Sequence, residues 1–209
     1  MRRSFYRLIR DLHLYIGLFI SPFVLVFAFS VFFLAYSWLP KIVSENSNTR
    51  MIAAFTLPDD LQALSGRPLI DALKPALASA GVHGEVGFVR HLVKEDKLII
   101  PVTIPGRVTT VSVNLTNRQA TIMTRETGLA DALVTLHKSP GPHGPDIRMN
   151  WIYMKVWRWM ADATVCLLLF VSVSGVYLWY VIRAERSVGF FLLFAGALSL
   201  FGMAYALSH

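Results

Sequence analysis

Three long runs without Asp, Glu, Lys or Arg constrain this sequence more than any other feature. They cover residues 12–40, 163–182 and 187–208. At about 1.5 Å per helical residue, the run 163–182 reaches roughly 30 Å, which matches the hydrocarbon core of a bilayer. A soluble domain of 209 residues seldom combines 55% hydrophobic with only 16% charged residues. The sequence therefore predicts an α-helical integral membrane protein with three transmembrane helices, whose first partner is the lipid bilayer.

Aromatic residues mark both ends of the second run. Trp151, Tyr153, Trp157 and Trp159 precede it, together with Lys155 and Arg158, and Tyr177, Trp179 and Tyr180 close it. Trp and Tyr side chains favour the headgroup region of a membrane, and basic residues favour its charged surface. We therefore interpret residues 151–182 as an interfacial collar followed by the second transmembrane helix.

The basic residues predict the orientation. Residues 1–11 contain four arginines, and clusters of arginine stay on the cytoplasmic side. We expect residues 1–11 and the turn 183–186 in the cytoplasm, helices over 12–40 and 187–209, and residues 41–150 on the far side. A cleavable signal peptide has an apolar core of only about 7–15 residues, so the first run is expected to be an uncleaved anchor. Topology and anionic lipid account for the net charge of +7, and no nucleic-acid partner is expected.

Residues 41–150 have the pattern of a small α+β module. A polar linker is expected over 44–50, and a helix is expected to open at Gly66 and stop at Gly81. Strands are predicted over 85–92, 97–104, 108–115 and 118–124, with the last two forming a hairpin, and a short helix is predicted over 128–138. The predicted helix and strands over 66–124 make a module of about 60 residues, which is marginally stable alone, so we expect it to lean on the membrane or a partner.

Two further patterns predict packing rather than chemistry. Ala195, Ser199, Gly202 and Ala206 recur at helical spacing in the third run. Small residues on one face let transmembrane helices approach closely, so this stripe predicts packing within the chain, self-association, or contact with other membrane subunits. Arg158 precedes Asp162 by one helical turn. Because an unpaired acid near the membrane is costly, the two are expected to form a structural ion pair.

Several motifs, in this order, resemble a known family. Leu12-His13 with Gly17-Leu18 opens the first run, a hairpin over 108–124 precedes Leu136-His137-Lys138, and Ser174-Gly175-Val176-Tyr177-Leu178-Trp179 closes the second run. The chain resembles the PepSY-associated transmembrane proteins, of the short three-span type with one PepSY-like module.

The resemblance implies a location and a chemistry. It implies a bacterial cytoplasmic (inner) membrane protein whose module is periplasmic. Some larger relatives bind b-type haem through transmembrane histidines and reduce ferric siderophores, and His13 and His137 match the family's histidines. Two features depart from the family pattern. Tyr36 stands where relatives often carry a histidine, and the loop over 139–145 is longer and richer in proline.

The histidines are the candidate cofactor ligands. A b-type haem takes two axial histidines on facing helices. His13 lies at the inner end of the first run, whereas His137 and His143 are expected at the outer side, and residues 13–36 span about 35 Å of helix. Three arrangements could therefore bind a haem. His13 could pair with His13 of a second copy, a partner protein could supply a ligand, or His137, His143 and His209 could cluster at the outer edge. Otherwise His13 is an interfacial histidine bonded to backbone or headgroups.

A copper site is a further alternative. His137 and His143 flank a rigid loop, and thioethers, which suit Cu(I), follow at Met149, Met154 and Met160. Methionines are also ordinary filler near membranes. The sequence has no phosphate-binding loop, no zinc-spaced Cys/His set and no nucleophile–base–acid arrangement. We therefore expect a non-catalytic accessory, assembly or interaction subunit of a membrane complex, with a b-haem electron-transfer protein as the alternative.

Overall fold

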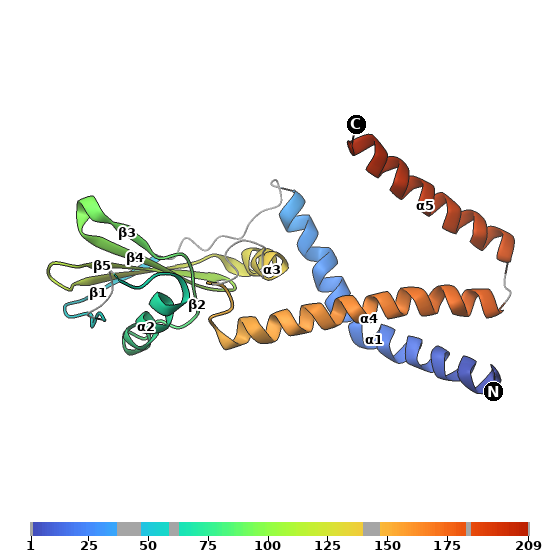
Figure 1. The fold of residues 1–209 in the computed structure, drawn as a ribbon, viewed down its shortest axis with the longest axis horizontal. Coiled ribbons are helices and arrows are strands. Elements are labelled where there is room, and N and C mark those ends of the chain that lie inside the picture. The colour runs from blue at the N-terminus through green and yellow to red at the C-terminus, as the bar shows by residue number, and fades with distance from the viewer. Residues whose placement is uncertain (1, 37–46, 59–62, 140–146, 183–184, 209) are drawn as a thin grey trace. The chain divides into compact units, whose positions relative to one another are not determined.

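The computed structural model describes residues 2–36, 47–58, 63–139, 147–182 and 185–208 (Figure 1). Contacts divide the chain into two units. One comprises Met1–Ser21 with Thr164–His209, and the other comprises Pro22–Ala163. Each unit is described by itself below.

The second unit contains an antiparallel sheet. Its strands are β1 (Ser47–Ile52), β2 (Glu85–Val86), β3 (Arg90–Leu92), β4 (Lys97–Ile104), β5 (Arg107–Asn114) and β6 (Ala120–Glu126). They lie in the order β1-β6-β5-β4-β2, and β3 also pairs with β4. Ile100, Val111 and Ile122 stand opposite one another across β4, β5 and β6. The predicted hairpin of β5 and β6 is confirmed.

Helix α2 (Gly66–Ser79) supplies the other half of the hydrophobic core of this sheet domain. Ile70 and Leu73 of α2 are almost fully buried, as are Ile100, Val111 and Ile122 of the sheet. The inward residues of β4 and β5 alternate with half-buried ones, because successive side chains of a strand point to opposite faces. The helix predicted to open at Gly66 is therefore confirmed, and Gly81 after it has φ +69°, which favours glycine.

Two expectations for this domain are wrong. The expected linker over 44–50 contributes residues to β1, which pairs with β6 from Ser47↔Arg125 to Ile52↔Ala120. An edge strand buries little, so its polar sequence lacks the usual alternation. The strand expected over 85–92 is divided into β2 and β3. Residues 87–89 stand opposite residues 100–101, so this strand carries one extra residue, a β-bulge, beside Pro101, which has no N–H to donate.

Five further elements occur in the described ranges. They are the 3₁₀ turn η1 (Val93–Glu95) and helices α1 (Arg2–Ala35), α3 (Gly128–Lys138), α4 (Ile152–Ile182) and α5 (Arg186–Ser208). Helix α3 agrees with its predicted bounds. Helix α1 begins at Arg2, because the arginines of the expected cytoplasmic segment are good helix formers. It ends at Ala35 rather than residue 40, and residues 37–46 lie outside the described part of the chain.

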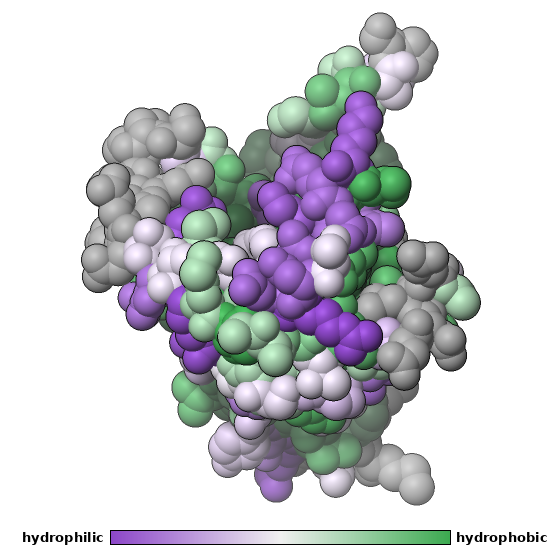
Figure 2. Space-filling view, turned by 90° about the vertical axis from the view of Figure 1, so that its left-hand side faces the viewer, coloured by the Kyte–Doolittle hydropathy of each residue, from purple (hydrophilic) through white to green (hydrophobic). Residues whose placement is uncertain are grey.

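Among the described residues, three helices are long and apolar enough to cross a membrane: α1 over Ser4–Ala35, α4 over Ile152–Ile182 and α5 over Arg186–Ser208. Large hydrophobic side chains are exposed along all three, such as Leu18 of α1, Leu169 of α4 and Phe201 of α5. Figure 2 looks at the sheet end of the molecule, where hydrophilic residues form a band beside smaller hydrophobic areas. The fold therefore combines a small sheet domain, whose core lies inside it, with apolar helices whose surfaces suit lipid.

Candidate functional site

Helix α1 takes part in two histidine–serine contacts, one in each unit. In the unit formed by Met1–Ser21 and Thr164–His209, the Nδ1 atom of His13 lies 2.8 Å from the Oγ atom of Ser174 on α4. Ser174 is buried, and a Cβ atom on the neighbouring Gly175 would lie 3.3 Å from Cε1 of His13. The missing side chain of Gly175 thus lets the imidazole lie close against the α4 backbone.

The second contact lies in the unit Pro22–Ala163. The Nδ1 atom of His137 on α3 lies 2.7 Å from the Oγ atom of Ser30 on α1, and Ser30 is 1% exposed. Phe27 packs edge-on against the His137 ring and stacks on Trp157, with ring centroids 5.6 and 5.7 Å apart. The indole of Trp157 donates a hydrogen bond to the Leu136 carbonyl at 3.1 Å. Phe27 therefore packs against the imidazole, and Trp157 supports both Phe27 and the end of α3.

The hydrogen bonds of the two serines suit one tautomer of each imidazole. A serine hydroxyl has a single hydrogen to donate, and the Val171 carbonyl lies 3.1 Å from Ser174 Oγ, while the Phe27 carbonyl lies 2.6 Å from Ser30 Oγ. A serine oxygen that gives its hydrogen to this carbonyl can accept from Nδ1–H of its histidine. That tautomer has its lone pair on Nε2, which has no hydrogen-bond partner among the described residues.

This arrangement is the one that metal-ligating histidines commonly have, with one ring N–H held by an acceptor and the other nitrogen free. A bis-histidine haem nevertheless lacks a second ligand. His13 is the only described histidine of its unit, and the other described histidines of the second unit, His83 and His91, are exposed in the sheet domain. His143 and His209 lie outside the described residues. The described residues therefore do not complete a bis-histidine haem site within either unit.

The copper alternative gains no geometric support. Among the described residues there is no group of three or more His, Cys, Asp or Glu side chains that could hold a metal ion. The sulfur of Met149 accepts a hydrogen bond from Arg158 at 3.0 Å, and Met154 is buried. These two thioethers thus have packing roles in the structure.

The residues expected to have structural roles are placed as follows. Arg158 Nε lies 3.7 Å from Asp162 Oδ2, so the predicted ion pair is present, with both side chains largely exposed. On α5, Ser199, Gly202 and Ala206 are exposed and Ala195 is half-buried. No described atom lies within 4 Å of a Cβ built on Gly202. The stripe of small residues is therefore open over most of its length.

Sequence reasoning did not identify Asn150, which joins the sheet domain to the start of α4. Its side-chain amide accepts from the Val86 N–H at 3.0 Å and donates to the Val86 carbonyl at 2.7 Å. It thereby occupies the edge of β2 as a neighbouring strand would. Asn150 is 7% exposed, and it also donates to the Ile147 carbonyl at 3.0 Å. No periodic pattern signals a single buried amide, and the same holds for Ser30 and Ser174.

Searches with the chain find no matching family model, no matching curated protein and no matching solved structure. The PepSY resemblance thus remains an expectation from the sequence motifs.

Proposed function

We propose that this protein is a non-catalytic membrane subunit of the PepSY-associated kind. Its three apolar helices anchor a small sheet domain, and α5 provides the surface for association with other membrane subunits or with a second copy. The observation that carries the proposal is α5 itself. No residue of this helix is classed as buried, and its stripe of small residues is open. Lipid alone can cover the large side chains of α5, but small residues on one face favour a close helix–helix contact.

The arginines of residues 1–11 support a cytoplasmic N-terminus, which would place the sheet domain in the periplasm of a bacterial inner membrane. A reporter fused after Ser47 tests this orientation, and activity of a cytosolic reporter there would reverse it.

Association through α5 is tested with two substitutions of the same type. Ala206→Leu places a bulky side chain in the stripe, whereas Ala204→Leu places one two residues earlier, on the opposite face of the helix. The oligomeric state of the full chain is measured in lipid nanodiscs by native mass spectrometry, and partners are measured by co-purification in mild detergent. We expect Ala206→Leu to weaken association by about tenfold, because a bulky side chain in the stripe keeps the two helices apart, and Ala204→Leu to leave it unchanged. A monomer without partners in the unmodified protein would contradict the proposal.

A b-haem electron-transfer protein, linked to reduction of periplasmic ferric siderophores, is a second candidate function. The observation that favours it is the matching environment of His13 and His137: each has Nδ1 against a serine hydroxyl, and Nε2 has no hydrogen-bond partner among the described residues. Haem would supply one-electron transfer, and these two residues would each offer one axial ligand. The second ligand of each iron would have to come from another copy or another subunit.

The absorption spectrum of protein from haem-replete cells distinguishes the two functions. If haem is bound, a reducible Soret band is expected, and His13→Ala or His137→Ala abolishes or diminishes it, while the exposed His83→Ala does not. Ser174→Ala or Ser30→Ala should then shift the reduction potential of the haem or weaken haem binding by about ten- to a hundredfold. Each serine hydroxyl orients the imidazole that would bind the iron. A colourless preparation rejects this candidate without affecting the first.

A further inference from the structure

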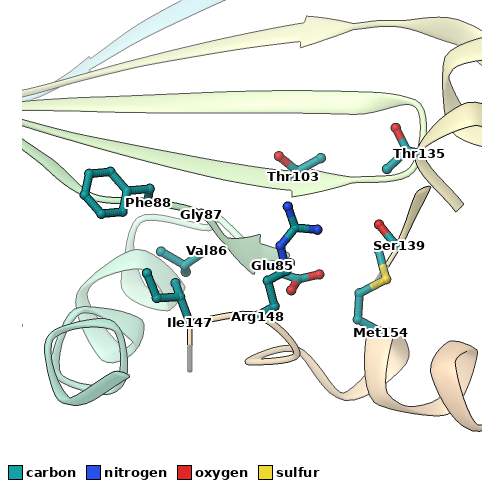
Figure 3. Close-up of a pocket in the computed structure, with 10 residues that line it drawn as sticks. All are labelled: Glu85, Val86, Gly87, Phe88, Thr103, Thr135, Ser139, Ile147, Arg148 and Met154. Atoms are coloured by element: carbon teal, nitrogen blue, oxygen red, sulfur yellow. The ribbon is translucent and has the colours of Figure 1, made fainter. Parts of the chain in front are cut away.

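A pocket of about 450 Å³ lies in the unit Pro22–Ala163, at the edge of the sheet where the chain turns into α4 (Figure 3). This volume falls within the usual range for small-ligand sites. The polar residues lining it are Glu85, Thr103, Thr135, Ser139 and Arg148, and the larger apolar ones are Val86, Phe88, Ile147 and Met154. Of these residues, the sequence pattern pointed only to Met154 as a ligand, and only for copper.

Two opposite charges face this pocket without pairing with each other. The guanidinium of Arg148 points into it between the labelled Thr103 and Glu85 (Figure 3). Arg148 is half-buried and makes no ion pair with any described residue. Arg67 of α2 pairs with Asp71 at 3.2 Å and donates to the Arg148 carbonyl at 3.4 Å. Within the part of the chain that the structure describes, no acid neutralises the Arg148 side chain.

Glu85 is held in place by the backbone. Its Oε1 atom accepts a hydrogen bond from the Met149 N–H at 2.6 Å. Met149 has φ +60°, a conformation uncommon for a residue other than glycine, and its sulfur accepts from Arg158. Together with the Asn150 amide on Val86, these contacts fix the segment 147–150 along the sheet edge. Glu85 lines the pocket, and its second carboxylate oxygen has no hydrogen-bond partner among the described residues.

A half-buried cation and a half-buried anion that do not neutralise each other suit a ligand that carries both charges. We propose that this pocket binds a zwitterionic group, with a primary ammonium on Glu85 and a phosphate or carboxylate oxyanion on Arg148. The hydroxyls of Thr103, Thr135 and Ser139 would provide further hydrogen bonds to the oxyanion.

The position of the pocket favours a phosphatidylethanolamine headgroup as the source. Met154, one wall of the pocket, lies in the first turn of α4, an apolar helix long enough to cross a membrane. Trp151 and Tyr153 lie beside it, with ring centroids 4.9 Å apart, and such residues favour the headgroup region. The same ammonium–oxyanion pair also occurs in soluble compounds such as phosphoethanolamine and free amino acids.

The test uses the full chain in nanodiscs of defined lipid, with retained lipid measured by native mass spectrometry and stability measured by thermal unfolding. Phosphatidylethanolamine should be retained and stabilise the protein. Phosphatidylglycerol lacks the ammonium, and phosphatidylcholine has no N–H to donate, so both should be retained at least tenfold less. Arg148→Gln and Glu85→Gln should each lower phosphatidylethanolamine affinity by about tenfold or more.

Matched controls are Arg90→Gln and Glu126→Gln, which change the same residue types outside the pocket and should have no effect. If a charge substitution disturbs folding, Thr135→Val and Ser139→Ala test the same site with a milder change. If free phosphoethanolamine stabilises the protein in detergent and the charge substitutions abolish this effect, the pocket binds the zwitterionic group, but from a soluble compound rather than a lipid. Equal retention of the three lipids with no effect of phosphoethanolamine, or retention that survives both charge substitutions, overturns the proposal.

Discussion

The sheet domain and the apolar helices of this chain use hydrophobic residues in opposite ways. In the sheet domain, Leu73, Ile100 and Val111 are buried. The face seen in Figure 2 carries a band of hydrophilic residues beside hydrophobic areas. In α4 and α5, side chains of the same kind lie outside, as Leu169 and Phe201 do at 62% and 70% exposure. Apolar content alone therefore does not define a core. In the sheet domain, apolar side chains are buried by other parts of the protein, whereas the apolar side chains of α4 and α5 form surfaces that suit lipid.

The largest effect is expected in the sheet core. Leu73→Ala removes a side chain that is 0% exposed and packed between α2 and the sheet, so it should lower the free energy of unfolding of this domain by about 2–5 kcal/mol. Hydrogen exchange of β4 and β5 peptides, measured by mass spectrometry, should accelerate by at least an order of magnitude. Met51→Ala, at an 82% exposed position of β1, is the control and should change exchange little.

A charge in α4 tests whether the exposed apolar surface faces lipid. Leu169→Lys should cost about 2.5–3.5 kcal/mol of membrane insertion, because Lys near the centre of a transmembrane helix is poorly tolerated. The fraction of α4 integrated into microsomal membranes should fall accordingly. The same change at Met51 of the sheet, which is still more exposed at 82%, should not alter integration. If Leu169→Lys were as harmless as Met51→Lys, the contrast between the two regions would fail.

The smallest effect concerns the surface of the sheet domain. A hydrogen bond from Lys74 Nζ at 2.7 Å, reinforced by Arg67, holds the pKa of Asp71 below its ordinary value. A carboxyl with a lowered pKa stabilises the folded state above its unfolded pKa of about 3.9, and this contribution is lost as the pH falls through the lower folded value. Because these groups are exposed, the contribution is only a few tenths of a kcal/mol.

Asp71→Asn should therefore slightly increase exchange of α2 amides at pH 7, and the difference from the unmodified protein should shrink below about pH 4. Glu126→Gln, which alters an acid without a described ion pair, should show no such difference at pH 7. A difference that grows toward acid pH would contradict the assigned role of the pair.

Much of the secondary structure could be predicted, because it is signalled by local periodicity. The β-branched alternation of β4, β5 and β6 and the apolar runs of the three long helices are visible within short windows. The exceptions have physical reasons. Strand β1 is polar because it lies at an edge of the sheet. The bulge over residues 87–89 lies opposite residues 100–101 of another strand, so it cannot be seen within one short window.

The candidate sites were predictable only in part. His13 and His137 stand out as histidines next to apolar runs, and the structure places each against a serine. Ser30 and Ser174 had no signal of their own, since a serine in an apolar helix usually bonds to its own backbone. The pocket is assembled from β2, β4, the end of α3 and the start of α4, so no single stretch could reveal it.

The sequence by itself determined where apolar helices occur and which segments alternate as strands, because both depend on residues close in the chain. Tertiary structure alone decided that Ser30 and Ser174 each lie against the Nδ1 atom of a histidine. It also decided that Glu85 and Arg148 line one pocket without pairing. The residues lie more than a hundred positions apart in the first case and more than sixty in the second, and only folding brings such residues together.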